Sequence, residues 1–121
     1  MERKALNAEA LTVNTSSLTA IANDYDYEKV FARQLEAKGK AGDVLIGITT
    51  SGSSGNVIKA FEAARNMGIK TIAFVGEKNV LALEHADIVV AVPSGITPRI
   101  QEMHIMIGHI ICEVVEKRLF G

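Results

Sequence analysis

The chain has 121 residues, enough for one compact domain and too few for two of typical size. Its 48% apolar and 22% charged residues are typical of a globular protein, and its net charge of −1 argues against a basic face for nucleic acid or anionic membrane. Cys112 is the only cysteine, which excludes an internal disulfide. We expect a single domain over residues 1–121. Without a signal peptide or a bilayer-length apolar run, we expect it in the cytoplasm.

The first forty residues predict one weak strand and two helices. A strand is expected over Ala8–Val13 and a short helix over Ser16–Ala22. A second helix then runs to Lys38, with Asp24 or Asp26 as its capping residue.

The clearest strand is Asp43–Thr49, which is apolar on both faces, as a central strand of a parallel sheet would be. A helix over Val57–Met67 and a strand over Lys70–Val75 follow. Next come a short helix within Asn79–His85 and a strand over Asp87–Val92.

A final helix begins near Pro98 and runs to about Arg118, with a broad apolar face. This alternation of strands and helices predicts an α/β fold, a three-layer sandwich with a mostly parallel sheet of about four strands. The last helix is more apolar than one small sheet can cover, so we expect a homo-oligomer.

The strongest chemical signal is the loop from Thr49 to Asn56, between a predicted strand and a helix N-terminus. Five of its first six residues carry hydroxyl groups, and helix N-termini attract anions. No lysine follows, and the glycine spacing does not fit a dinucleotide binder, so no nucleotide cofactor is expected. The loop suits a small phosphate monoester; the alternative is an ordinary Ser/Gly turn with a helix cap.

The last helix carries polar groups of a second kind. Gln101 and His109 are eight residues apart, about 80° around the helix axis and ~12 Å along it. They share a face, and a neighbouring subunit is one way to complete a site around them. Histidine suits proton transfer and metal binding, whereas we interpret His104 as an interface or core residue. By themselves, Asn23 and Asp24 indicate only a cap or turn.

Taken together, four segments resemble the sugar isomerase (SIS) domain family, and within it the phosphoheptose isomerases. They are Leu18–Asp24 (LTAIAND), Gly42–Ser54 (GDVLIGITTSGSS), Asn56–Ala60 (NVIKA) and Arg99–His104 (RIQEMH). The segments fall in order along nearly the whole chain. The resemblance implies a flavodoxin-like SIS fold matching the C-terminal two-thirds of those enzymes.

The resemblance implies an aldose–ketose isomerisation of sedoheptulose 7-phosphate to D-glycero-D-manno-heptose 7-phosphate, toward nucleotide-activated heptose. The reaction would pass through an enediol, with His109 as the catalytic histidine. The substrate would be bound by Asn23, Asp24, Thr49, Thr50, Ser51, Ser54 and Gln101. In members that bind zinc, Gln101 and His109 would be two of its ligands. The family also implies a tetramer with sites between subunits.

Two departures from the family pattern stand out. Thr49 replaces the usual serine, which keeps the hydroxyl but adds a methyl group. Before the position matching Met1, family members carry a helical segment, a first strand and a helix with a further His and Glu. We therefore expect an N-terminally shortened member, in which the strand at Ala8–Val13 needs a different pairing or a partner chain.

Two other functions share parts of this pattern. A protein that associates with the bacterial DnaA initiator has the same fold and much of the RIQEMH stretch, but no histidine matching His109. A sugar-phosphate-sensing domain would also use the phosphate loop. The DNA-reaching helix-turn-helix of SIS-type regulators is absent from the sequence. His109 therefore favours the isomerase.

Overall fold

Three parallel strands form the centre of the protein. The computed structural model describes residues 2–121, except for the side chain of Val80. The strands are β1 (Val44–Ile48), β2 (Lys70–Val75) and β3 (Ile88–Ala91), arranged in the order β1-β2-β3. The predicted parallel sheet is confirmed.

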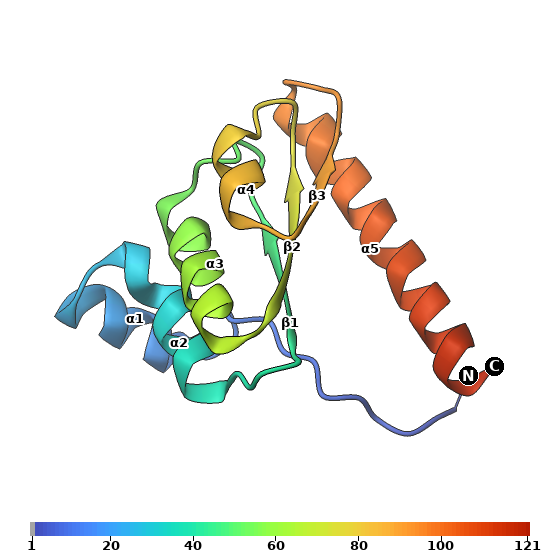
Figure 1. Ribbon diagram of the computed structural model, residues 1–121, viewed down its shortest axis with the longest axis horizontal. Helices are drawn as coiled ribbons and strands as arrows, with labels where there is room; N and C mark the ends of the chain where they lie inside the picture. Colours follow the sequence, from blue (N-terminus) through green and yellow to red (C-terminus); the bar gives the residue numbers. More distant parts are fainter. Residues whose placement is uncertain (1) are drawn as a thin grey trace.

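Helices lie on both faces of this sheet, in three layers (Figure 1). The helices that precede the last strand all lie on one side of the sheet, and the last helix alone lies on the other. In chain order they are α1 (Thr15–Asp24), the 3₁₀ helix η1 (Tyr27–Lys29), α2 (Val30–Lys38), α3 (Gly55–Met67), α4 (Val80–His85) and α5 (Thr97–Phe120). The predicted α/β three-layer fold is confirmed.

Local signals fixed most of these boundaries. Gly68 ends α3 in the left-handed conformation, with φ of 72°, which costs glycine nothing. Pro98 lies in the first turn of α5, where its missing N–H has no partner to lose. The predicted capping of the second helix is wrong, because Lys29 precedes α2 and Asp26 precedes η1, in both cases without a side-chain capping bond.

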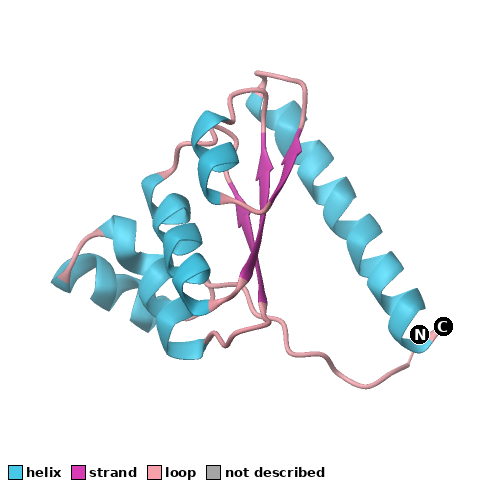
Figure 2. Cartoon of the chain, viewed as in Figure 1, coloured by secondary structure: helices cyan, strands magenta, loops and turns pink. Residues whose placement is uncertain are grey.

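The predicted strand at Ala8–Val13 is wrong, and the sheet has three strands rather than about four. This segment is loop and turn (Figure 2). A strand needs a neighbouring backbone to bond, whereas here the carbonyl of Leu11 accepts a hydrogen bond of 2.9 Å from the side-chain amide of Gln34. The Leu11 side chain packs against a cluster that includes Leu35 and Ile69, so its apolar character serves a helix contact.

The main core lies between the sheet and α3. Phe61 is fully buried there with Val57 and Ile58, against Ala73 and Val75 of β2. Gly47 of β1 allows the close approach, since a Cβ at this position would come 2.5 Å from the Phe61 ring. The Phe61 ring therefore occupies the space that a side chain at Gly47 would fill.

The other face of the sheet is only partly covered. Alternate β1 side chains point there, and Val44, Ile46 and Ile48 are 60%, 44% and 56% exposed. The expectation of a central strand is wrong for β1, which is an edge strand with β2 as its neighbour. Apolar residues on both faces indicate that a strand is buried on both sides, but they do not show whether its own chain or another copy covers it.

Helix α5 contacts the sheet only near its own N-terminus and then diverges from it (Figure 1). Ile100 and His104 are buried, but most of the predicted apolar face beyond them is exposed, including Ile110, Val114 and Val115. No helix within residues 2–121 is both long and apolar enough to cross a membrane.

We expect Gly47→Ala to destabilise the fold by about 1–3 kcal/mol, because the new methyl group displaces the Phe61 ring from a filled core. Gly108→Ala is the matched control. Nothing lies within 4 Å of a Cβ at Gly108 of α5, so this change should stabilise the helix by up to about 1 kcal/mol. Urea unfolding measures both, and equal effects would contradict the packing account.

A second prediction concerns acid. The N–H of Thr71 donates to the carboxylate of Asp87 at 2.9 Å and the Thr71 hydroxyl does so at 3.1 Å, which ties the start of β3 to β2. These bonds, the backbone one first, lower the pKa of Asp87 below its ordinary 3.8. A carboxyl group whose pKa is lower in the folded protein than in the unfolded chain stabilises the fold at any pH above its unfolded-state pKa. This stabilisation is lost as the pH falls through the folded-state pKa.

We therefore expect Asp87→Ala to reduce the free energy of unfolding near neutral pH, with a smaller reduction below about pH 3. Urea titrations of both proteins across this range give the difference at each pH. A difference that stays constant with pH would show that the charge on Asp87 contributes nothing.

Candidate functional site

Three loops meet at one edge of the sheet, because the carboxyl ends of parallel strands point the same way. They are residues 49–54 after β1, 76–79 after β2 and 92–96 after β3 (Figure 1). In open α/β sheets, ligands bind outside this edge. The predicted phosphate loop is the first of the three.

Hydroxyl groups of the phosphate loop bond to one another around Thr49. This threonine is 4% exposed, and its Oγ1 lies 2.7 Å from Ser54 Oγ and 3.3 Å from Ser51 Oγ. The hydroxyl of Ser51 also accepts from the N–H of Ser53 at 3.2 Å. Ser54 is the N-cap of α3 and makes no side-chain capping bond, so the cluster lies at the N-terminus of that helix.

The loop after β2 supports the phosphate loop from one side. Gly52 has a φ of 70°, in the left-handed region, and a Cβ there would collide with the carbonyl oxygen of Lys78. The two backbones are therefore in direct contact at this point. This contact joins the phosphate loop to the loop after β2.

A pocket of about 250 Å³ opens beside the phosphate loop, and we call it the edge pocket. All three loops contribute to it, and the buried Ile100 of α5 adds an apolar side chain. Its other lining residues are Thr50, Ser51, Glu77, Lys78, Ser94, Gly95 and Thr97. The sequence analysis missed Glu77 and Lys78 as site residues. Their place directly after a buried strand was the available signal.

The two histidines of α5 differ in environment. His104 is 4% exposed, donates from Nε2 to the carbonyl oxygen of Val75 at 2.9 Å and packs against Phe74. The structure thus places His104 in the core, one of the two predicted settings. Gln101 and His109 are exposed on the same helix.

The remaining predicted residues lie across the sheet from α5. Asn23 and Asp24 are exposed at the end of α1, where the Asn23 amide donates to the Asp24 carboxylate at 3.1 Å. Figure 1 shows α1 and α5 on opposite faces of the sheet. A single copy therefore brings Thr49, Thr50, Ser51 and Ser54 together, and it does not bring His109 to Asn23 and Asp24.

The described residues of one copy do not fit a zinc site. Among residues 2–121, no three His, Cys, Asp or Glu side chains come together in a way that could hold a metal ion. Gln101 and His109, the two predicted ligands, are separated by about 12 Å along α5.

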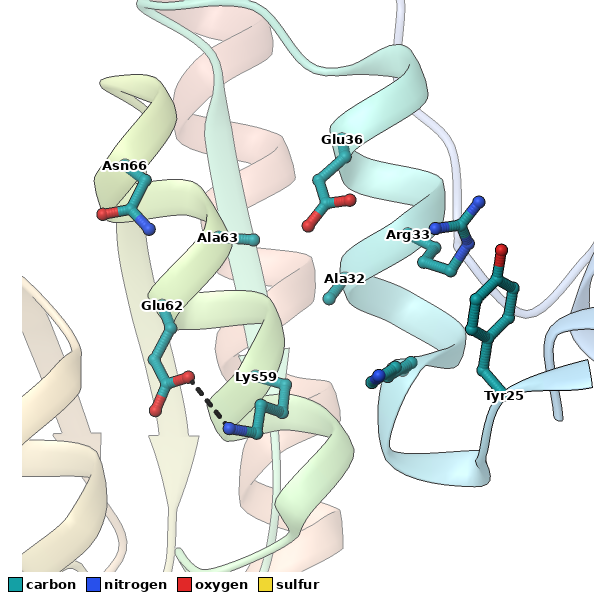
Figure 3. A pocket seen from close by; sticks show the side chains of 9 residues that line it. Tyr25, Ala32, Arg33, Glu36, Lys59, Glu62, Ala63 and Asn66 are labelled. Carbon is teal, nitrogen blue, oxygen red and sulfur yellow. Dashed lines mark hydrogen bonds and ion pairs between the residues drawn. The ribbon is translucent and has the colours of Figure 1, made fainter.

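A larger groove of about 320 Å³ lies between α2 and α3, away from the strand ends (Figure 3). Its floor is formed by Ala32 and Ala63, and its walls carry exposed charges of both signs. Lys59 pairs with Glu62 at 3.3 Å, and the Arg33 guanidinium lies over the Tyr25 ring. These charges neutralise or stack on neighbours instead of converging, so the edge pocket is the better candidate site.

Comparison with known proteins identifies the family. Residues 1–76 match the SIS domain family, which is more than half of the chain. The chain belongs to the SIS domain family. This agrees with the resemblance of the sequence segments and with a phosphate loop at the carboxyl edge.

Relatives of this SIS domain include phosphoheptose isomerases. Those of Clostridium acetobutylicum and Sulfurimonas denitrificans are 58% and 54% identical to it over 121 and 120 residues. The solved phosphoheptose isomerase of Francisella tularensis superposes with a TM-score of 0.91 at 37% identity over 95% of this chain. The SIS domain spans 62% of the length of each of these three proteins.

We expect the two histidines to separate by stability. His104→Ala removes a buried ring and its bond to Val75, so it should lower the free energy of unfolding by about 2–4 kcal/mol. His109→Ala changes an exposed side chain and should stay within about 0.5 kcal/mol of the parent. Urea unfolding tests both, and a large loss in His109→Ala would assign that residue a structural role.

Proposed function

We propose that this SIS domain acts in an aldose–ketose isomerase that converts sedoheptulose 7-phosphate into D-glycero-D-manno-heptose 7-phosphate. The product would feed the synthesis of nucleotide-activated heptose, in the cytoplasm. One observation carries the proposal: a cluster of hydroxyls at the N-terminus of α3 borders a pocket at the carboxyl edge of the sheet. The names of the relatives support this particular substrate.

The phosphate loop supplies the recognition of the phosphate group. Thr49, Thr50, Ser51 and Ser54 offer hydroxyl donors. The first turn of α3 adds the N–H groups of Gly55 and Asn56 and the positive end of the helix dipole. In the free protein these hydroxyls bond to one another, and they can rotate to donate to phosphate oxygens. Binding then needs little rearrangement of the backbone.

The isomerisation moves two protons and no net electrons. A base takes the proton from the carbon next to the carbonyl, the carbonyl oxygen gains a proton, and an enediol results. Return of a proton to the former carbonyl carbon, with loss of one from the other oxygen, completes the exchange. His109 is the proposed proton carrier, since an imidazole ring can both accept and donate a proton, and Gln101 would hold a substrate oxygen.

We propose that this site forms between copies of the chain, as a homo-oligomer and by family resemblance a tetramer. Two observations support this. Helix α1, which carries Asn23 and Asp24, lies across the sheet from α5, which carries His109, so one copy cannot surround a small substrate with all three (Figure 1). The exposed Ile46 and Ile48 of β1 and the exposed far half of α5 also leave apolar surface for another copy to bury.

A zinc ion, if the assembled protein binds one, would need ligands beyond Gln101 and His109 of one copy. A second copy is one source for them. The proton transfers above are assigned only to groups of the protein.

The test measures turnover and binding separately. We expect the purified chain to convert sedoheptulose 7-phosphate, with and without added zinc, and His109→Ala to lose about 10²–10⁴-fold in kcat. Because His109 is outside the phosphate loop, this variant should keep the thermal protection that the sugar phosphate gives. Ser54→Ala, which removes a member of the hydroxyl cluster, should lose most of that protection.

Full turnover in His109→Ala would overturn the assigned role of this histidine. Protection without turnover in the parent chain would show a binding or sensing protein instead of an isomerase. Ser54→Ala that binds as well as the parent would show that the phosphate lies elsewhere.

A further inference from the structure

The edge pocket holds one carboxylate, that of Glu77, and its place in the fold is fixed. Glu77 follows β2, and its backbone N–H donates to the carbonyl oxygen of Ser94 at 3.2 Å, which joins the second and third loops. Its carboxylate lies over Gly95, where a Cβ would come 2.5 Å from Oε1. The absence of a side chain at Gly95 leaves the space that this carboxylate occupies.

The carboxylate of Glu77 has no cationic partner among residues 2–121. The ion pairs of that part of the chain involve other acidic residues. Glu77 is exposed and lines the pocket beside Thr50 and Ser51. Its acceptor oxygens are therefore available to a ligand.

The pocket thus has two chemically different ends. On the side of the phosphate loop, the pocket is lined by Thr50 and Ser51, whose hydroxyl groups can donate to an anion. The end at Glu77 accepts hydrogen bonds and repels an anion, so it suits neutral hydroxyl groups. A ligand that satisfies both ends carries a phosphate on a polyhydroxylated chain.

We infer that Glu77 is a specificity-determining residue that accepts hydrogen bonds from sugar hydroxyls while the phosphate loop holds the phosphate. The inference rests on the proposed function for its ligand, and it adds a residue to the set that the sequence predicted. Neighbouring Lys78 balances the charge of Glu77, so the pocket as a whole does not repel a sugar phosphate.

The experiment compares two ligands by calorimetric titration of the full chain, sedoheptulose 7-phosphate and inorganic phosphate. Glu77→Ala should weaken binding of the sugar phosphate by about 10–100-fold, the range expected for loss of a hydrogen bond to a charged group. Inorganic phosphate should bind Glu77→Ala at least as well as the parent, because it makes no use of the carboxylate. Glu84→Ala, at an exposed glutamate of α4 outside the pocket, is the charge-matched control and should change neither.

Three results would overturn the inference. Equal weakening of both ligands would show that Glu77 only supports the loops, and unchanged sugar-phosphate binding would show that the hydroxyls lie elsewhere. In both cases the parent chain still binds the sugar phosphate, so the proposed function survives. If the parent chain binds neither ligand, the proposed function and the inference fail together.

Discussion

Parallel pairing of three strands is the constraint from which the rest of this structure follows. Strands that run the same way need crossover connections, and α3 and α4 supply them on one face of the sheet. The same pairing places three strand-to-helix loops at one edge. The phosphate loop, the loop of Glu77 and the loop of Ser94 are distant in sequence and adjacent in space for this reason alone.

Within that frame, small residues set how closely the parts approach. Gly47 lets α3 lie against β1, and Gly52 lets the phosphate loop rest on the backbone of Lys78. Each is a place where a side chain would push two elements apart. The position of the hydroxyl cluster therefore depends on the absence of side chains at these glycines as much as on Thr49 and Ser54 themselves.

The sequence predicted most of the fold because its signals were local. Buried strands stood out as short apolar runs, and Gly68 and Pro98 marked helix ends. The strand prediction for Ala8–Val13 was wrong because alternating apolar residues indicate an apolar side of a segment and not the presence of a neighbouring strand. The edge position of β1 was missed for a related reason. Its apolar residues indicate that both faces of the strand are buried, but they do not show whether the same chain or another copy buries them.

The candidate site was predictable where chemistry is concentrated and not where it is dispersed. Thr49–Ser54 forms a run of hydroxyls, and the structure draws it into one bonded cluster. Glu77 is a single acidic residue in a loop, and its place directly after a buried strand is the only sequence signal that separates it from Glu84. Only the convergence of three loops gives it significance. His104 and His109 lie on the same predicted helix, and it is the packing of His104 against Phe74 that distinguishes the two.

The divergence of α5 from the sheet has a consequence for local stability. The helix is about 36 Å long, yet its buried side chains, Ile100 and His104, both lie in its first third. Its far end is joined to the rest of the chain by the partly exposed ion pair of Arg3 with Glu116, a contact worth at most about 1 kcal/mol. In an isolated copy, amide hydrogens beyond Gly108 are therefore held by little more than helix propensity and exchange through local opening. Helical order in the far half of α5 then becomes a gauge of whether this chain is alone or assembled.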